Sequence, residues 1–196
     1  MPAEAPTGLR IIAGRWRGRK LRTPPGRDLR PTADRTRTAL FNILMHAGDY
    51  PPLAGAAVLD AFAGTGANGL EALSRGAAIA AFLENDRGAL ALIKANVATL
   101  GAEDATLVLQ GDATKPGTPP RRFDIVLLDP PYRSGLGSVA LAALARARWL
   151  TDDALAVIEQ GSDDPFTPPD GFSVVDERRY GRAALYFLRA ALPVSA

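Results

Sequence analysis

The chain has 196 residues, 47% of them hydrophobic, and a formal net charge of +2. This length suits one substantial core with a small appendage, and the lack of cysteine excludes disulfides, thiolate metal sites and cysteine nucleophiles. The first residues lack the basic start and apolar run of a secretory signal, and no stretch approaches the roughly 18 apolar residues of a membrane span. We therefore expect a soluble, cytoplasmic protein.

The positive charge is concentrated at the front of the chain. Residues 1–37 contain ten Lys or Arg and three Asp or Glu, a net charge of +7, so the other 159 residues carry −5. A basic front on a mildly acidic body is typical of a protein that docks on phosphates. The alternative is a solubilising basic tail.

The first predicted element is a basic β-hairpin or short extended arm over residues 9–22, where apolar and basic side chains partly alternate. Apolar residues at helical spacing then predict a helix over 34–47, with Thr32 as a possible cap. The chain is accordingly divided into an arm, 1–31, and a larger domain, 32–196.

The rest of the chain alternates between apolar runs and helical segments. The runs predict strands buried on both faces, at 56–60, 79–83, 105–109, 124–128 and 154–158. The intervening segments predict helices near 67–75, 87–99 and 137–148. This order indicates an α/β fold with a mostly parallel sheet. Only two residues separate the last runs, 172–180 and 183–189, so these must form an antiparallel hairpin.

A glycine-rich turn follows the first predicted strand. Residues 64–69 read G-T-G-A-N-G, a literal match to the dinucleotide fingerprint G-x-G-x-x-G. However, Asp60 ends the strand and three residues separate it from Gly64, whereas a nicotinamide site brings its first glycine close to the strand. A carboxylate at that point would repel a diphosphate but suits a ligand with a cationic amino-acid end, such as S-adenosylmethionine.

Two further acids follow the next two strands. Glu84 is placed to accept protons from ribose hydroxyls, and Asp112 to accept the amino hydrogens of adenine. Each acid alone could be a solvated loop carboxylate. Three acids at three successive strand ends favour a ligand site along that edge of the sheet.

The most informative segment is F-D-I-V-L-L-D-P-P-Y at 123–132, which places Asp129, Pro130, Pro131 and Tyr132 at the same edge. An exocyclic amino nitrogen of a base is a poor nucleophile because its lone pair is delocalised into the ring. The Asp129 carboxylate and the Pro130 carbonyl could accept its hydrogens and free the lone pair for attack. Two prolines stiffen the loop, and Tyr132 offers a face for base stacking. No general base is needed, and the single histidine, His46, is expected at a helix end on the surface.

These motifs together resemble the class I amino-methyltransferases, and the chain resembles the RsmD family of 16S ribosomal RNA guanine-N2 methyltransferases over nearly all of residues 9–190. The front segments R-I-I-A-G-R-W-R-G-R-K-L at 10–21 and L-R-P-T-A-D-R-T-R-T-A-L-F-N-I-L at 29–44 carry the most specific part of the resemblance. It implies a Rossmann-like sheet of seven strands with the last antiparallel, S-adenosylmethionine as methyl donor, and the small ribosomal subunit or an assembly intermediate as substrate.

The motifs and the resemblance define three sets of candidate residues. The expected cofactor-binding set is Asp60, Phe62, Ala63, Gly64, Thr65, Gly66, Glu84, Asp112 and Ala113. The expected catalytic set is Asp129, Pro130, Pro131 and Tyr132, and the expected RNA-binding set is Arg15, Arg17, Arg19, Lys20 and Arg35. No metal site is expected, and the protein is expected to be a monomer.

Three rival functions remain open at this stage. An amino-methyltransferase of DNA adenine or cytosine would carry the same D-P-P-Y motif, although the chain has no obvious target-recognition domain. A non-catalytic RNA-binding or assembly factor could keep the fold. A nicotinamide dehydrogenase is supported only by the glycine match. The loop 114–122 is assigned neither to RNA contact nor to plain connection.

Overall fold

The computed structural model describes residues 8–24 and 31–190, with the side chains of residues 31–33 outside the description. Within these described residues there are four α-helices and a short 3-10 turn: α1 (Pro31–His46), α2 (Ala67–Ser74), α3 (Arg87–Leu100), η1 (Glu103–Ala105) and α4 (Leu136–Arg146). The strands are β1 (Ala57–Ala61), β2 (Ile79–Glu84), β3 (Thr106–Gln110), β4 (Phe123–Leu128), β5 (Leu150–Gly161), β6 (Phe172–Tyr180) and β7 (Ala183–Ala190).

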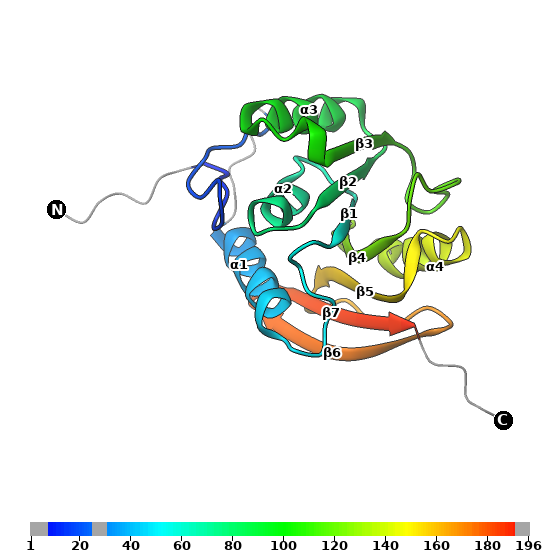
Figure 1. Cartoon of the computed structure of the whole chain (residues 1–196). Helices are drawn as coiled ribbons and strands as arrows, with labels where there is room; N and C mark the ends of the chain where they lie inside the picture. Colours follow the sequence, from blue (N-terminus) through cyan, green and yellow to red (C-terminus); the bar gives the residue numbers. More distant parts are fainter. Residues whose placement is uncertain (1–7, 25–30, 191–196) are drawn as a thin grey trace.

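The seven strands form one sheet in the order β3-β2-β1-β4-β5-β7-β6 (Figure 1). Strands β1 to β5 pair in parallel, whereas β7 runs antiparallel to both β5 and β6. The predicted mostly parallel α/β sheet with a C-terminal antiparallel hairpin is therefore confirmed. Because the strand order reverses between β1 and β4, a crevice is expected at the carboxyl ends of these two strands.

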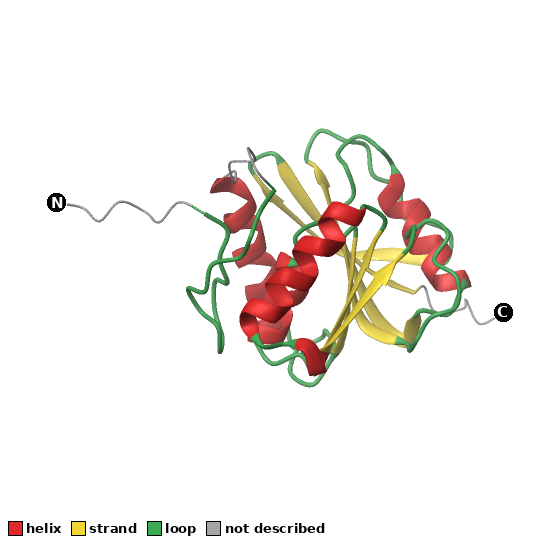
Figure 2. Cartoon of the chain, turned by 90° about the horizontal axis from the view of Figure 1, so that it is seen from above, coloured by secondary structure: helices red, strands yellow, loops and turns green. Residues whose placement is uncertain are grey.

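Helices cover both faces of the sheet (Figure 2). One face packs on α1, α2 and α3, as shown by Phe41, Leu70 and Ile93, which share one buried cluster with strand residues. The other face packs on α4, through Leu141 and Leu144. Burial of the sheet on both faces explains why its central strands read as continuous apolar runs.

Two boundaries differ from the sequence prediction. Helix α1 begins at Pro31, so the proposed cap at Thr32 is wrong, since Thr32 already lies inside the helix; proline suits the first helical position because its missing N–H has no partner there anyway. Strand β5 extends beyond the predicted 154–158 at both ends, where its sequence turns polar and the apolar signal stops. In the part of the chain that the structure describes, no helix has the length and apolar character needed to cross a membrane.

Residues 9–22, here called the N-terminal arm, form an irregular hairpin that packs on the body. Arg10 and Lys20 form an isolated antiparallel bridge, and Leu21 donates a backbone hydrogen bond to Leu9 at 2.8 Å. Leu9, Ile11 and Leu21 are buried in the same cluster as α1 to α3. The arm is thus part of the hydrophobic core, although its tip is exposed.

Candidate cofactor and target site

Acidic side chains from adjacent strands meet at the carboxyl edge of the sheet. Side chains alternate between the two faces along each strand, and Leu59 and Leu128 pack toward α4. The following residues, Asp60 and Asp129, therefore lie on the opposite face, toward α1. Glu84 follows Leu83 of the α4 side and lies on the α1 face by the same alternation. The predicted convergence of these acids is present in the structure.

The glycine-rich loop turns sharply between β1 and α2. Gly64 and Gly66 adopt positive φ of 54° and 78°, and Gly66 is the N-cap of α2. A Cβ at Gly69 would come within 2.4 Å of the Phe82 ring, so this position must be glycine for α2 to pack on the sheet. Phe62 also has a positive φ of 61°, a strained conformation of the kind that accumulates at functional sites.

Asp60 is a buried acid that has few compensating contacts. It is 1% exposed, and its Oδ2 accepts a hydrogen bond from the Gly69 N–H at 2.9 Å. Its pKa is raised to about 8, mainly by burial and in smaller part by the charges of Asp129 and Glu84, although the Gly69 hydrogen bond lowers it. A cationic ligand group beside Asp60 would restore its ionised form.

The other two predicted cofactor acids differ in their surroundings. The Glu84 carboxyl is buried and accepts the N–H of Gly64 at 2.8 Å, as well as those of Asn85 and Asp86, both at 2.9 Å. It therefore holds the glycine loop in place and keeps only part of its acceptor capacity for a ligand. Asp112 is exposed, and its hydrogen bonds from Thr114 lower its pKa; Ala113 beside it is buried.

The D-P-P-Y segment forms a stiff turn beyond β4. Pro130 is buried, and the Pro131 carbonyl accepts a hydrogen bond from the Ser134 hydroxyl at 2.5 Å. Asp129 is exposed at the edge of the sheet, yet the surrounding protein removes part of the hydration of its carboxyl group, and this desolvation raises its pKa to about 6. Tyr132 is 45% exposed, so its ring is accessible to an incoming planar group.

Two residues at the site were missed by the sequence prediction. Glu159 on β5 follows Ile158, which pairs with Leu128 on β4, so Glu159 lies beside Asp129. The acid-at-strand-end pattern used for the other strands would have found it. Arg37 is 6% exposed on α1, and its charge lowers the pKa of both Asp60 and Glu159. Arg37 is at helical spacing from Leu40, Phe41 and Leu44, and this spacing was the signal in the sequence that the arginine faces inward.

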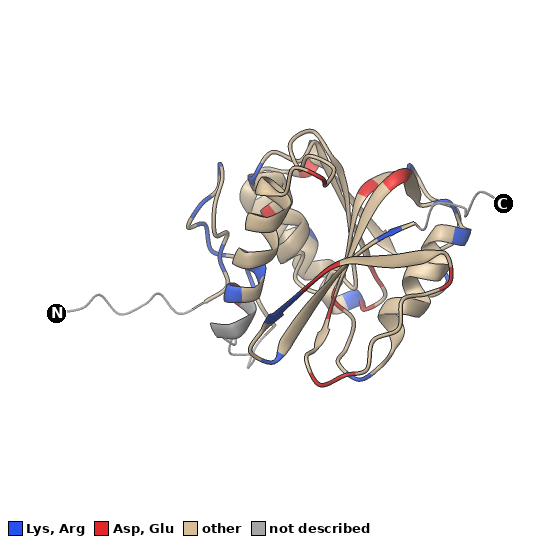
Figure 3. Cartoon of the chain, turned by 90° about the horizontal axis from the view of Figure 1, so that it is seen from below, with Lys and Arg blue, Asp and Glu red and all other residues tan. Residues whose placement is uncertain are grey.

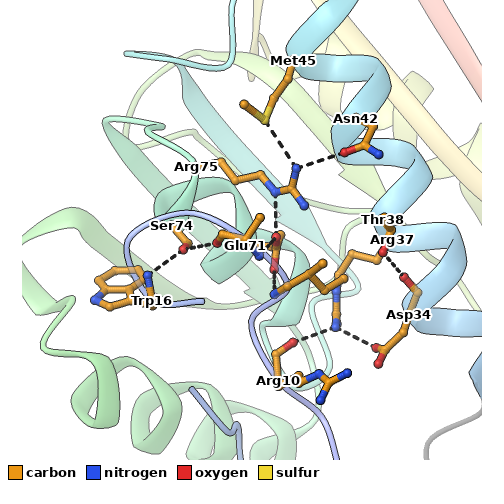
Figure 4. Close-up of polar contacts among 12 residues, drawn as sticks. Arg10, Trp16, Asp34, Arg37, Thr38, Asn42, Met45, Glu71, Ser74 and Arg75 are labelled. Atoms are coloured by element: carbon orange, nitrogen blue, oxygen red, sulfur yellow. Dashed lines mark hydrogen bonds and ion pairs between the residues drawn. The ribbon is translucent and has the colours of Figure 1, made fainter. Parts of the chain in front are cut away.

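The N-terminal arm is anchored to α2 by a buried carboxylate (Figure 4). Glu71 accepts the backbone N–H groups of Ile12 and Ala13, at 2.7 and 3.0 Å, and pairs with Arg75 at 2.7 Å. Ser74 donates to the Ala13 carbonyl at 2.5 Å and accepts from the N–H of Trp16 at 3.0 Å. These bonds satisfy backbone groups that the irregular arm cannot pair with itself.

A buried asparagine connects the arm to the glycine loop. The Asn96 amide exchanges two hydrogen bonds with the Arg22 backbone, at 2.6 and 3.1 Å. The same amide donates to the Thr65 carbonyl at 2.9 Å. One side chain of α3 thus contacts both the arm and the loop.

The predicted RNA-binding residues have different environments. Arg17, Lys20 and Arg35 are exposed, and Figure 3 shows the basic positions along the arm. The Arg15 guanidinium lies 3.9 Å from the centroid of the Trp16 ring, and Arg19 donates to the Thr99 carbonyl at 2.8 Å. The basic groups are therefore displayed from a surface that is fixed to the body.

Two hollows lie away from the glycine loop. One, of about 630 Å³, is lined by the arm, α1 and α2, including Arg15 and His46. The other, of about 480 Å³, is lined by Pro130, Pro131 and the segment after β5. Among the residues that the structure describes, no cluster of His, Asp and Glu is suited to a metal ion.

The sheet topology and the glycine loop at its edge define the class of Rossmann-like methyltransferases. A family model described as "Conserved hypothetical protein 95" matches residues 9–189. The chain belongs to this family, that of the RsmD proteins.

Named relatives agree with this assignment. The chain is 42% identical to ribosomal RNA small subunit methyltransferase D of Escherichia coli, over 90% of this chain and 87% of that protein. It is 39% identical to the protein of that name from Haemophilus influenzae, over 88% of this chain and 89% of the relative.

Solved structures show the same fold. The Escherichia coli protein yhhF superposes with a TM-score of 0.78 at 41% identity, covering 93% of this chain and 97% of that one. Magnesium protoporphyrin IX methyltransferase of Synechocystis, solved with bound SAM, has a TM-score of 0.61 at 15% identity over 81% of this chain and 80% of that one, and shares the fold.

Proposed function

We propose that the protein transfers a methyl group from S-adenosylmethionine to the exocyclic N2 amino group of a guanine in small-subunit ribosomal RNA. The observation that carries the proposal is the arrangement of Asp60 and the D-P-P-Y segment on adjacent strands, facing the same side of one sheet edge. This edge presents an acceptor for a cation and an acceptor for an amino group next to each other. The substrate places the enzyme in the cytoplasm, where it acts as a monomer.

The residues on the β1 side fit S-adenosylmethionine. Asp60 is a buried acid with a raised pKa and suits a cationic amino-acid end. The cofactor could come close to the backbone at Gly64 and Gly66, in a loop that also contains Phe62, Ala63 and Thr65. Glu84 would accept hydrogen bonds from the ribose hydroxyls. Asp112 and Ala113 lie after β3, where an adenine would be held. When bound, S-adenosylmethionine supplies an electrophilic sulfonium methyl group.

The residues on the β4 side position the amino group. The Asp129 carboxylate and the Pro130 carbonyl accept its two hydrogens, which draws the nitrogen toward tetrahedral geometry and frees the lone pair. Tyr132 stacks on the base and fixes the direction of attack, a contribution of about 1 to 3 kcal/mol for such stacking. The nitrogen forms its bond to the methyl carbon as the bond to sulfur breaks, and the sulfur keeps that electron pair. The amino proton is then released.

The guanine choice rests on the family assignment and the basic arm. The arm presents Arg15, Arg17, Arg19 and Lys20 on an exposed surface that is anchored to the last turns of α2 and α3, and α1 adds Arg35, a layout that suits phosphate contacts. We also propose a functional division of the chain. The front segment, residues 1–31, which includes the N-terminal arm, docks RNA, and the methyltransferase domain, residues 32–196, performs the transfer.

The substrate is tested by methylation of small-subunit particles, naked ribosomal RNA and duplex DNA with a labelled donor, followed by mass spectrometry of the modified base. We expect label in RNA as N2-methylguanine. Label in DNA alone would contradict the proposal, and label on adenine would overturn its guanine part.

Two variants separate cofactor binding from transfer. In calorimetry, we expect Asp60→Ala to weaken S-adenosylmethionine binding by at least about tenfold, because it removes the partner of the cationic end. We expect Asp129→Ala to bind the cofactor normally but to lose at least about 100-fold in transfer rate, as for other groups that act on the reacting centre. Asp152→Ala, an exposed acid at the opposite edge of the sheet, is the control and should change neither quantity. Absence of cofactor binding by the unmutated protein would favour a non-catalytic assembly factor instead.

A further inference from the structure

A second carboxyl group lies next to the proposed amino-binding acid. Glu159 and Asp129 follow the paired residues Ile158 and Leu128 on neighbouring parallel strands. Val157 packs in the cluster on the α1 side, so Glu159, two residues further on, lies on that same face. Both carboxyl groups therefore point to the side where the base must lie.

The tyrosine of the D-P-P-Y segment orients this second carboxyl group. The Tyr132 hydroxyl donates a hydrogen bond to Oε1 of Glu159 at 3.2 Å. The stacking ring and the carboxyl group are thereby held as a unit. A base that stacks on Tyr132 would have its polar edge within reach of Glu159.

Two adjacent, partly desolvated acids favour a ligand that is rich in hydrogen-bond donors. Desolvation raises the pKa of Glu159, and the charge of Asp129 raises it further, while Arg37 lowers it. Without a ligand the pair is electrostatically unfavourable. Hydrogen-bond donors from a substrate, one for each carboxyl group, would relieve the repulsion and favour the ionised forms.

Guanine has the matching edge. Its ring N1–H and its N2 amino group are neighbouring donors on the Watson–Crick edge, which is the edge read when a base is taken out of its stack. Adenine and cytosine instead carry an unprotonated ring nitrogen beside the amino group. The lone pair of that nitrogen would face a carboxylate oxygen, an arrangement that is repulsive.

We propose that Glu159 is a specificity-determining residue that accepts the N1–H of guanine while Asp129 accepts from the N2 amino group. This inference rests on the proposed function and explains which of the three amino-bearing bases the site selects. A site that leaves buried polar groups unpaired with the wrong substrate can discriminate strongly.

The test uses 2-aminopurine, which keeps the N2 amino group but has an unprotonated N1. Small-subunit particles are assembled with RNA that carries guanine or 2-aminopurine at the mapped target position, and kcat/KM is compared. Above about pH 8, where Glu159 is ionised and can only accept hydrogen bonds, we expect the unmutated enzyme to prefer guanine by at least about 100-fold. In Glu159→Gln the amide can donate to the unprotonated N1, so the preference should fall below about tenfold, with slower methylation of guanine.

Two controls separate recognition from folding. Glu159→Gln should bind S-adenosylmethionine as the unmutated protein does and should unfold at a temperature no lower than that of the unmutated protein. Tyr132→Phe keeps the ring but removes the hydroxyl that orients Glu159, so it should reduce the guanine preference by a smaller factor than Glu159→Gln.

The outcomes distinguish the two levels of the proposal. Methylation of guanine with an undiminished preference in Glu159→Gln overturns the role of Glu159 and leaves the proposed function standing. Methylation of adenine or cytosine, or of no base at all, by the unmutated enzyme means that the proposed function fails and the role of Glu159 with it.

Discussion

At the scale of single residues, the site is built from acids whose burial is costly to the ligand-free protein. Asp60 accepts only one described hydrogen bond, from Gly69, and neighbouring acids raise its pKa. Such a group favours ligand binding at the expense of folding stability, as is common at functional sites. Its effect on stability can be measured directly.

Asp60→Asn should stabilise the ligand-free protein at alkaline pH. The folded-state pKa of Asp60 is raised from 3.8 to about 8, so its contribution to stability is fully present below the unfolded pKa and is lost as the pH rises through that interval. Each pH unit between the two values costs up to about 1.4 kcal/mol. Asparagine carries no charge and can still accept from Gly69.

Urea unfolding of both proteins between pH 5 and pH 8.5 provides the measurement. We expect the advantage of the variant over the unmutated protein to grow by at least about 2 kcal/mol across this range. Parallel curves for the two proteins would show that Asp60 is not a buried acid of raised pKa. Saturating S-adenosylmethionine should narrow the difference, because it binds the ionised acid.

The residues of the site were predictable to the extent that they stood at the ends of strongly apolar strands. Asp60, Glu84 and Asp129 end or directly follow such runs, so their convergence could be expected from the sequence. Glu159 directly follows the predicted run 154–158 in the same way, but the pattern was not extended to this strand. Arg37 was missed because arginines near a basic arm read as surface groups, whereas its side chain is buried.

At the scale of elements, the arm owes its position to α2. The Cβ of any residue other than glycine at position 14 would lie 1.9 Å from the Ser74 carbonyl oxygen. Gly18 has the same φ of 81° but nothing within 4 Å of such an atom. A substitution at Gly18 therefore tests backbone strain alone, whereas a substitution at Gly14 tests strain together with the close approach of the arm to α2.

Gly14→Ala should detach the arm tip, whereas Gly18→Ala should only strain it. A left-handed alanine costs roughly 1–2 kcal/mol, which both variants incur. Gly14→Ala also breaks the contact with Ser74, so we expect folding stability to fall by about 3 kcal/mol or more in total. Tryptic cleavage at Arg15, Arg17 and Arg19, compared at equal protease, should accelerate strongly in Gly14→Ala alone. Equal cleavage rates would refute the anchoring role.

The elements themselves were largely visible in the sequence because apolar runs and helical periodicity report burial. The docking of the arm was not visible. It depends on Glu71 and Asn96, which are fully buried polar residues on helices, and polar residues on a helix are ordinarily expected at the surface. Their hydrogen-bond partners, most of them backbone groups of the arm, explain their burial.

At the scale of the whole molecule, the charge distribution separates a basic front from an acidic body. Exposed basic residues on the arm are fixed to the body of the protein rather than carried on a free tail, because Leu9, Ile11 and Leu21 are core residues. This supports phosphate docking over the solubilising-tail interpretation. The sequence predicted the charge difference but not that the arm is anchored.

Replacement of Arg15, Arg17, Arg19 and Lys20 by glutamine should weaken RNA binding and reduce its salt dependence. For every phosphate that the variant no longer binds, the slope of log K against log salt should become shallower by about one. Arg121 and Arg148 are exposed at the opposite edge of the sheet, before β4 and β5, and their double replacement is the control. An equal effect per charge in the control would indicate a general field rather than a docking surface.

Under the proposed function, the Asn96 amide would link the binding of RNA on the arm to the binding of the methyl donor at the glycine loop. Because this one side chain fixes both Arg22 and Thr65, a shift of either segment disturbs the hydrogen bonds of the other. Coupling between two binding equilibria is reciprocal. RNA bound on the arm should therefore increase the affinity for the methyl donor by the same factor by which the donor increases the affinity for RNA. The demethylated product should lower the affinity for RNA to the extent that it changes the position of the loop.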